Sequence, residues 1–105
     1  MRGFIVGVMG AGHNADKDDI ANAYELGRLI AQEGWIVLSG GRDVGVMAAV
    51  NQGAKQVPDS ITLGILPSAD TKPNQYVDIA IITDMHAARN NINVLSSNVV
   101  VACGC

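Results

Sequence analysis

The chain has 105 residues, a net charge of −3, 49% apolar residues and only 16% charged ones. This length predicts one domain over residues 1–105, near the lower end of what can bury a layered core. The seven Lys and Arg residues are scattered along the chain. Without a basic patch, neither nucleic acid nor an anionic membrane is expected as a main partner. No apolar run approaches the ~18 residues of a membrane span or the length of a usual signal peptide, so we expect a cytoplasmic protein.

Five short apolar runs rich in Val and Ile recur along the chain. They show little in/out alternation, which is typical of strands buried on both faces of a parallel sheet. These runs span residues 4–9, 35–38, 61–66, 77–83 and 98–103. Helical patterns between them predict helices over about 19–33 and 45–56, and a third helix that follows Asp84.

The expected helix ends follow from single residues. Asp16 and Asp19 favour the start of the first helix, and Gly34 favours its end. Asp84 is a suitable N-cap for the third helix. The intervals of three and four residues predict that one apolar face of this helix packs inward. That face consists of Met85, Ala88, Ile92 and Leu95.

The order of these elements predicts a three-layer, doubly wound, Rossmann-like α/β fold. Its parallel sheet should have about five strands in the order 3-2-1-4-5. One connection tests this order. Residues 67–76 would have to carry the chain past three strand spacings, about 14 Å sideways, while also returning along the strand length. Ten residues manage this only when nearly extended.

Ligands of such sheets bind beyond the carboxyl ends of the strands, where this chain places two glycine-rich loops. The first loop, which contains Gly7, Gly10 and Gly12, differs from the dinucleotide fingerprint G-x-G-x-x-G. A P-loop fails too, because no Lys-Ser/Thr pair follows either loop. Backbone amides at such turns can still hold a phosphate, and Arg42 favours that reading. The alternative is that the glycines only permit tight turns.

Metal binding is not expected. His13 and His86 have no metal-ligand spacing, and two cysteines at positions 103 and 105 are too few for a zinc site. We expect both cysteines to be small packing residues in a reducing compartment.

Two segments resemble a known group of proteins. "SGGRDVGVMAAV" (residues 39–50) resembles the Gly-Gly-Gly-x-x-Gly-Leu-Met-Gly segment of the LOG ("lonely guy") and molybdenum-cofactor-carrier-like Rossmann proteins, often called lysine decarboxylase-like. "GILPSADTKPNQYVDIAIITDMHAARNNINVLSSNVVVACG" (64–104) is especially similar to the carrier-like branch. The resemblance covers nearly the whole chain. It implies binding of a phosphorylated pterin cofactor, or cleavage of nucleoside 5'-monophosphates as in LOG enzymes.

The resemblance also implies site residues. Gly40, Gly41 and Gly45 match phosphate-side glycines, and Arg89 matches the arginine of the family's Glu-Arg-Lys segment, although Asn90 replaces the lysine. No resident cofactor is required, but a nucleotide or molybdopterin-type ligand is expected. The full set of expected ligand-binding residues is Gly10, Ala11, Gly12, Ser39, Gly40, Gly41, Arg42, Gly45, Arg89 and Asn90.

The family's second signature, Pro-Gly-Gly-x-Gly-Thr-x-x-Glu, is expected after the fifth strand, where this sequence stops. The expected catalytic glutamate is therefore absent, and no catalytic residue is assigned. Three hypotheses remain. The chain is a carrier-like binding protein, a phosphoribohydrolase completed by another subunit or a missing C-terminal part, or a truncated product that keeps the fold without activity. Strands and helices absent from the sheet would leave apolar surface exposed, so we also expect a homo-oligomer.

Overall fold

The structure is a computed structural model that describes residues 3–104 and contains one five-stranded parallel sheet. The fold class predicted from the sequence is confirmed. The strands are β1 (Ile5–Gly10), β2 (Ile36–Ser39), β3 (Thr62–Leu66), β4 (Ile79–Ile82) and β5 (Val99–Cys103). The helices are α1 (Lys17–Gln32), α2 (Gly45–Ala54), the short 3-10 helix η1 (His86–Arg89) and α3 (Asn90–Ser96).

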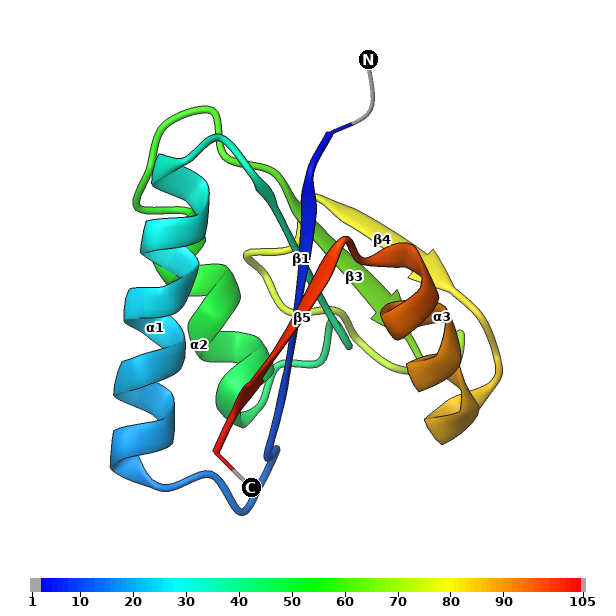
Figure 1. Ribbon diagram of the computed structural model, residues 1–105. Coiled ribbons are helices and arrows are strands. Elements are labelled where there is room, and N and C mark those ends of the chain that lie inside the picture. The colour runs from blue at the N-terminus through cyan, green and yellow to red at the C-terminus, as the bar shows by residue number, and fades with distance from the viewer. Residues whose placement is uncertain (1–2, 105) are drawn as a thin grey trace.

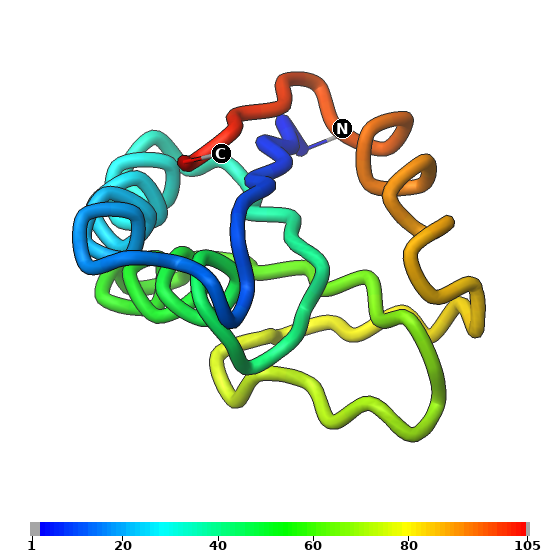
Figure 2. Tube along the Cα trace, turned by 90° about the horizontal axis from the view of Figure 1, so that it is seen from below, coloured from blue at the N-terminus to red at the C-terminus, as the bar shows by residue number. Residues whose placement is uncertain are grey.

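The helices lie on both faces of the sheet and make three layers. Helices α1 and α2 pack side by side on one face, whereas α3 lies on the other, as the two views show (Figure 1, Figure 2). The two faces are unequally covered, because α3 has seven residues and α1 has sixteen. The α1–α2 face therefore holds the main core.

The strand order is β4-β3-β2-β1-β5. It keeps the predicted 3-2-1 centre, but the fourth strand is placed differently. Strand β4 pairs with β3 instead of crossing to β1, and β5 takes the place beside β1. The connection 67–76 has to cover only one strand spacing this way, so it need not be extended. It folds back against the loop after β2, where Asn74 donates its amide hydrogen to the carbonyl of Gly41 at 2.8 Å.

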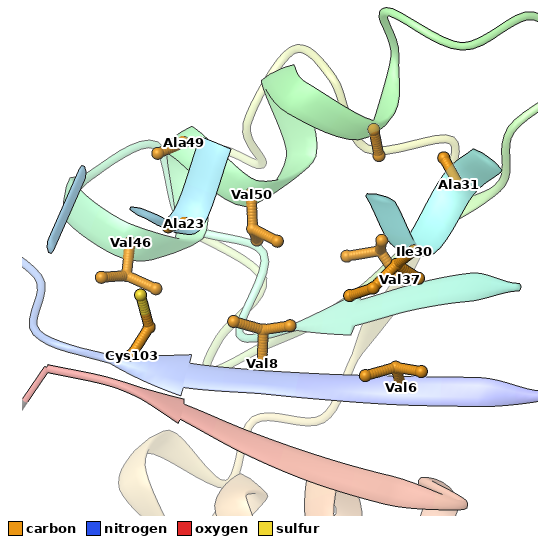
Figure 3. Close-up of a cluster of buried hydrophobic side chains, with 11 residues drawn as sticks. Val6, Val8, Ala23, Ile30, Ala31, Val37, Val46, Ala49, Val50 and Cys103 are labelled. Atoms are coloured by element: carbon orange, nitrogen blue, oxygen red, sulfur yellow. The ribbon is translucent and has the colours of Figure 1, made fainter. Parts of the chain in front are cut away.

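The core lies between the sheet and the α1–α2 pair (Figure 3). Valines from β1 and β2 face apolar side chains of both helices, as the alternation of a strand with one face toward each layer requires. The helices approach so closely that a Cβ on Gly27 would lie 2.0 Å from the carbonyl oxygen of Val50. The buried cluster comprises Val6, Val8, Ala23, Ile30, Ala31, Val37, Val46, Ala49, Val50, Ala54 and Cys103.

Helix α1 begins and ends as the sequence predicts. The side chain of Asp16 accepts a hydrogen bond from the amide of Asp19, and the reciprocal bond completes a capping box. Gly34 follows the C-cap with φ 77°, the left-handed conformation that favours glycine.

The third helical segment differs from its prediction. Asp84 has φ 54° and does not cap a helix, and the segment opens with η1 rather than with an α-helical turn. A 3-10 turn has 3.0 residues per turn, so it rotates the face that the following helix presents to the sheet. The predicted inward face is therefore largely exposed, with Leu95 at 85%, whereas Asn93 is completely buried.

Apolar side chains remain exposed on the outer strands of the sheet and on α3. They come from β4, α3 and β5, and the largest are Ile79, Ile81, Ile82, Val94, Leu95, Val99 and Val100. Both outer strands also have one unpaired edge within the described residues. Separately, no helix within residues 3–104 is long and apolar enough to cross a membrane.

Candidate functional site

A cavity of about 380 Å³ lies at the carboxyl ends of β1 and β2. The start of α2 borders it on one side, and η1 and α3 border it on the other. This volume falls within the range of about 300–1,000 Å³ that is usual for small-molecule sites. The cavity is lined by Val8, Met9, Gly10, Gly12, Gly40, Arg42, Met47, Arg89, Asn90, Asn93 and Val94.

Six of the ten residues expected to bind a ligand line this cavity. They come from three separate stretches of the chain, and the fold brings them together as expected for the carboxyl edge of a parallel sheet. These six are Gly10, Gly12, Gly40, Arg42, Arg89 and Asn90. The other four, Ala11, Ser39, Gly41 and Gly45, do not line it.

Ser39 and Gly41 shape the loop after β2 instead. Ser39 is fully buried, and its Oγ accepts hydrogen bonds from the Gly41 amide at 3.1 Å and from Asn51 Nδ2 at 3.2 Å. Gly41 has φ 77°, and a Cβ there would lie 3.0 Å from a methyl carbon of Leu66. The turn itself therefore explains both residues. This agrees with the alternative interpretation of the loop, in which its residues form a tight turn rather than bind a ligand.

Ala11 and Gly45 join the two glycine loops. A Cβ on Gly45 would lie 2.2 Å from the carbonyl oxygen of Gly12 and 2.4 Å from that of Ala11. The carbonyl of Ala11 accepts a hydrogen bond from the Val46 amide at 3.0 Å. One amide at the start of α2 is thus already used within the protein. Fewer backbone amides are therefore free to bind an anion than the two glycine loops predicted. The positive potential of the cavity depends more on its arginines.

Arg89 is held rigidly at the cavity wall. Its Nε donates to the carbonyl of Ile65 at 2.9 Å, and its Nη1 donates to the carbonyl of His86 at 2.9 Å. The remaining nitrogen, Nη2, lies 2.8 Å from where a Cβ on Gly40 would be. The absent side chain at Gly40 therefore makes room for the guanidinium.

The two cavity arginines form no ion pair with any carboxylate within residues 3–104. The ion pairs there are Arg28 with Glu25 and Lys55 with Asp78. Burial, and then the nearby positive charge of Arg42, lower the pKa of Arg89 below its usual value. Two like charges that share a partly enclosed cavity favour an anion between them.

The sequence reasoning missed five of the residues that line the cavity. Four are apolar and one is an amide: Val8, Met9, Met47, Val94 and Asn93. The sequence carries no signal for Asn93, because the predicted inward face of this helix consisted of Met85, Ala88, Ile92 and Leu95. For Met9 no signal existed either, because methionine at the end of a buried strand reads equally well as core.

Metal-binding and acidic side chains do not gather at this cavity within residues 3–104. Within the described part of the chain, no three His, Cys, Asp or Glu residues gather as a metal site would require. No Asp or Glu lines the cavity. Cys103 is buried in the core, as expected, and its burial, together with the negative charge of Asp19, raises the pKa of its thiol. Cys105 lies outside the described residues.

Comparison with known proteins gives a consistent set of relatives. Residues 3–105 match the model of the SLOG cluster4 family. An uncharacterised protein of Archaeoglobus fulgidus is 40% identical over 99 residues, which cover 94% of this chain and 64% of that protein.

Two solved structures are similar over essentially the whole chain. The molybdenum cofactor binding protein of the phototrophic bacterium Rippkaea orientalis has 57% identity and a TM-score of 0.96, over 100% of this chain and 64% of that one. The Moco carrier protein of Chlamydomonas reinhardtii has 47% identity and a TM-score of 0.90, over 99% and 64%. The chain thus spans 64% of the length of each of these relatives.

Proposed function

The chain belongs to the SLOG cluster4 family, and from this premise we propose that it binds a phosphorylated nucleotide-like or pterin-like molecule in the cavity at the carboxyl ends of β1 and β2. The anionic group of the ligand contacts Arg42, Arg89 and the backbone near Gly40. The ring system of the ligand packs against the apolar side chains of the cavity lining. The protein holds this molecule as cargo rather than converting it.

One observation carries this proposal. Arg42 and Arg89 line the same cavity, and neither has a carboxylate partner within residues 3–104. Burial, and then the charge of Arg42, lower the pKa of Arg89, so keeping both cations in this partly buried place costs free energy. A bound phosphate removes that repulsion and accepts charge-assisted hydrogen bonds from the free Nη2 of Arg89.

A molybdopterin-type cofactor is the leading candidate for the cargo. Solved relatives are named as molybdenum cofactor binding or carrier proteins. The residues of this chain suit such a molecule, because the cavity lining combines two arginines for a phosphate with apolar side chains and amides for a ring system. The absence of a Cβ at Gly40 leaves room for the Arg89 guanidinium that would hold the phosphate.

Isothermal titration with guanosine 5'-monophosphate, which carries both a phosphate and a lactam ring, tests the proposal. Arg89→Ala should weaken binding about 10-fold to 100-fold, the effect of losing a charge-assisted hydrogen bond. Arg28→Ala serves as the matched control, because it removes the same charge from the exposed pair with Glu25 on α1. Equal affinities of the Arg89 and Arg28 variants would contradict the proposed site.

We also propose that the protein forms a homo-oligomer through the exposed apolar surface of β4, α3 and β5. The exposed apolar side chains of β4, α3 and β5 support this, since such surface is costly to leave in water. Light scattering coupled to size-exclusion chromatography should give at least a dimer at micromolar concentration. Leu95→Lys should shift the population toward the monomer, and a monomeric wild type would contradict the proposal.

A further inference from the structure

Asn93 is one of the residues that line the cavity, and its buried side chain has an unused hydrogen-bond acceptor. Its side chain is completely buried, and its Oδ1 has no hydrogen-bond partner among residues 3–104. Its Nδ2 lies 3.9 Å from the sulfur of Met9 and 3.5 Å from Oδ1 of Asn90, so both contacts are long. A thioether sulfur accepts but never donates, which assigns the nitrogen to the Met9 side and leaves the oxygen free.

An unpaired buried amide oxygen destabilises a protein, and native proteins contain few of them. Other buried acceptors without partners, such as Asn51 Oδ1, do not line the cavity. Asn93 therefore differs from these residues because it lines the cavity. It sits beside apolar surface from Met9 and Val94, in the same cavity that holds Arg89.

We propose that Asn93 determines ligand specificity by turning its Oδ1, which is buried in this structure, toward the cavity, where it accepts a hydrogen bond from a ring N–H of the bound heterocycle. This inference rests on the proposed function and narrows it. The ligand is an anionic molecule whose ring carries an N–H donor on its edge, as lactams do. A ring fits beside Asn93 better than a sugar does. The apolar side chains of Met9 and Val94 can pack against the face of an aromatic ring, but they offer no hydrogen-bond partners to several hydroxyl groups.

Two nucleotides that share ribose and phosphate test the inference. Inosine 5'-monophosphate has a ring N–H, whereas purine riboside 5'-monophosphate has no N–H on its base. Isothermal titration of the wild type should give at least about tenfold tighter binding of the inosine nucleotide, because a site built around a hydrogen bond rejects an analogue that leaves its buried group unpaired. This comparison needs no variant.

Asn93→Leu, which has a similar volume without polar atoms, should reduce that preference to about twofold or less. Its affinity for ribose 5-phosphate should stay within about twofold of the wild type, since the arginines are untouched. Asn91→Leu is the matched control, because Asn91 is exposed on the same helix and lies outside the cavity. It should keep the full preference.

Thermal unfolding of the ligand-free proteins separates binding from a merely structural role. If Asn93 serves the ligand, Asn93→Leu leaves the midpoint unchanged or raises it, because an unpaired acceptor is removed. A lower midpoint together with an unchanged nucleotide preference would assign Asn93 to the fold and overturn the inference. A wild type without preference, whose ribose 5-phosphate binding still depends on Arg89, would overturn it while the proposed function stands. Failure of all three phosphates to bind would overturn both.

Discussion

Gly40 and Gly41 are adjacent in the loop after β2, and each position requires glycine for a different reason. Alanine substitution should separate the two reasons. Gly41 has φ 77°, which costs an alanine about 1–2 kcal/mol, and its Cβ would crowd Leu66 and the backbone of Gly64. At about 4–8 °C per kcal/mol in a domain of this size, Gly41→Ala should lower Tm by about 5–15 °C. Gly40 has no positive φ, so its backbone accepts alanine.

The cost of Gly40→Ala should fall on ligand binding instead. The new Cβ would lie 2.6 Å from the sulfur of Met47 and 2.8 Å from Nη2 of Arg89. Arg89 can yield only by loosening its hydrogen bonds to Ile65 and His86, which contribute about 1 kcal/mol each. Affinity for guanosine 5'-monophosphate should therefore fall about tenfold or more, while Tm drops by less than about 5 °C.

Differential scanning calorimetry and isothermal titration on the two variants provide the assay. The reasoning is refuted if Gly40→Ala binds the nucleotide as the wild type does, or if Gly40→Ala loses as much stability as Gly41→Ala. Either result would mean that Arg89 does not need the space above Gly40.

Three further outcomes are expected. Gly27→Ala should lower the free energy of unfolding, measured in urea, by about 3 kcal/mol or more, because the methyl group meets the carbonyl of Val50 and the helices must separate. A change below about 1 kcal/mol would mean that α1 and α2 do not pack this closely. Burial disfavours the charged form of Asp78, but its hydrogen bonds from Lys55 and the Thr62 amide lower its pKa overall. This carboxylate therefore stabilises the fold above the unfolded pKa of about 4 and loses that effect as the pH falls through its lower folded value, so Asp78→Asn should flatten the acid limb of a Tm-against-pH curve between about pH 5 and 2. Adenosine 5'-monophosphate incubated with the protein should release no adenine by chromatography, because no carboxylate of residues 3–104 lines the cavity to stabilise charge on the sugar.

The sequence was most informative where local rules act alone. The acidic residues Asp16 and Asp19 at the start of α1 and the stop at Gly34 follow from rules that act within one turn, and both are present. The Val- and Ile-rich runs likewise predict the parallel sheet, because strands covered on both faces need no alternation.

The sequence was less informative where distant parts of the chain decide. The place of β4 depends on whether residues 67–76 cross the sheet or fold back, and the contact between Asn74 and Gly41 that decides it joins segments about thirty residues apart. The inward face of α3 depends on the 3-10 turn before it, which shifts the phase enough to bury Asn93 and expose Leu95.

The sequence predicted the glycines and arginines of the candidate site but not its apolar residues or Asn93. Glycines after strands, together with Arg42 and Arg89, have a recognisable pattern, and the fold brings these residues to one cavity. Ser39 also follows a strand, but its hydroxyl group already accepts a hydrogen bond from Asn51, which lies twelve residues away on α2. The spacing of residues near Ser39 does not predict a hydrogen-bond partner that distant.

A crystal structure of the protein with guanosine 5'-monophosphate tests the central claim most directly. The account predicts the phosphate within hydrogen-bonding distance of Arg89 Nη2, near Arg42 and the backbone of Gly40, with the base beside Asn93. A nucleotide bound elsewhere, or a phosphate turned away from both arginines, would contradict it.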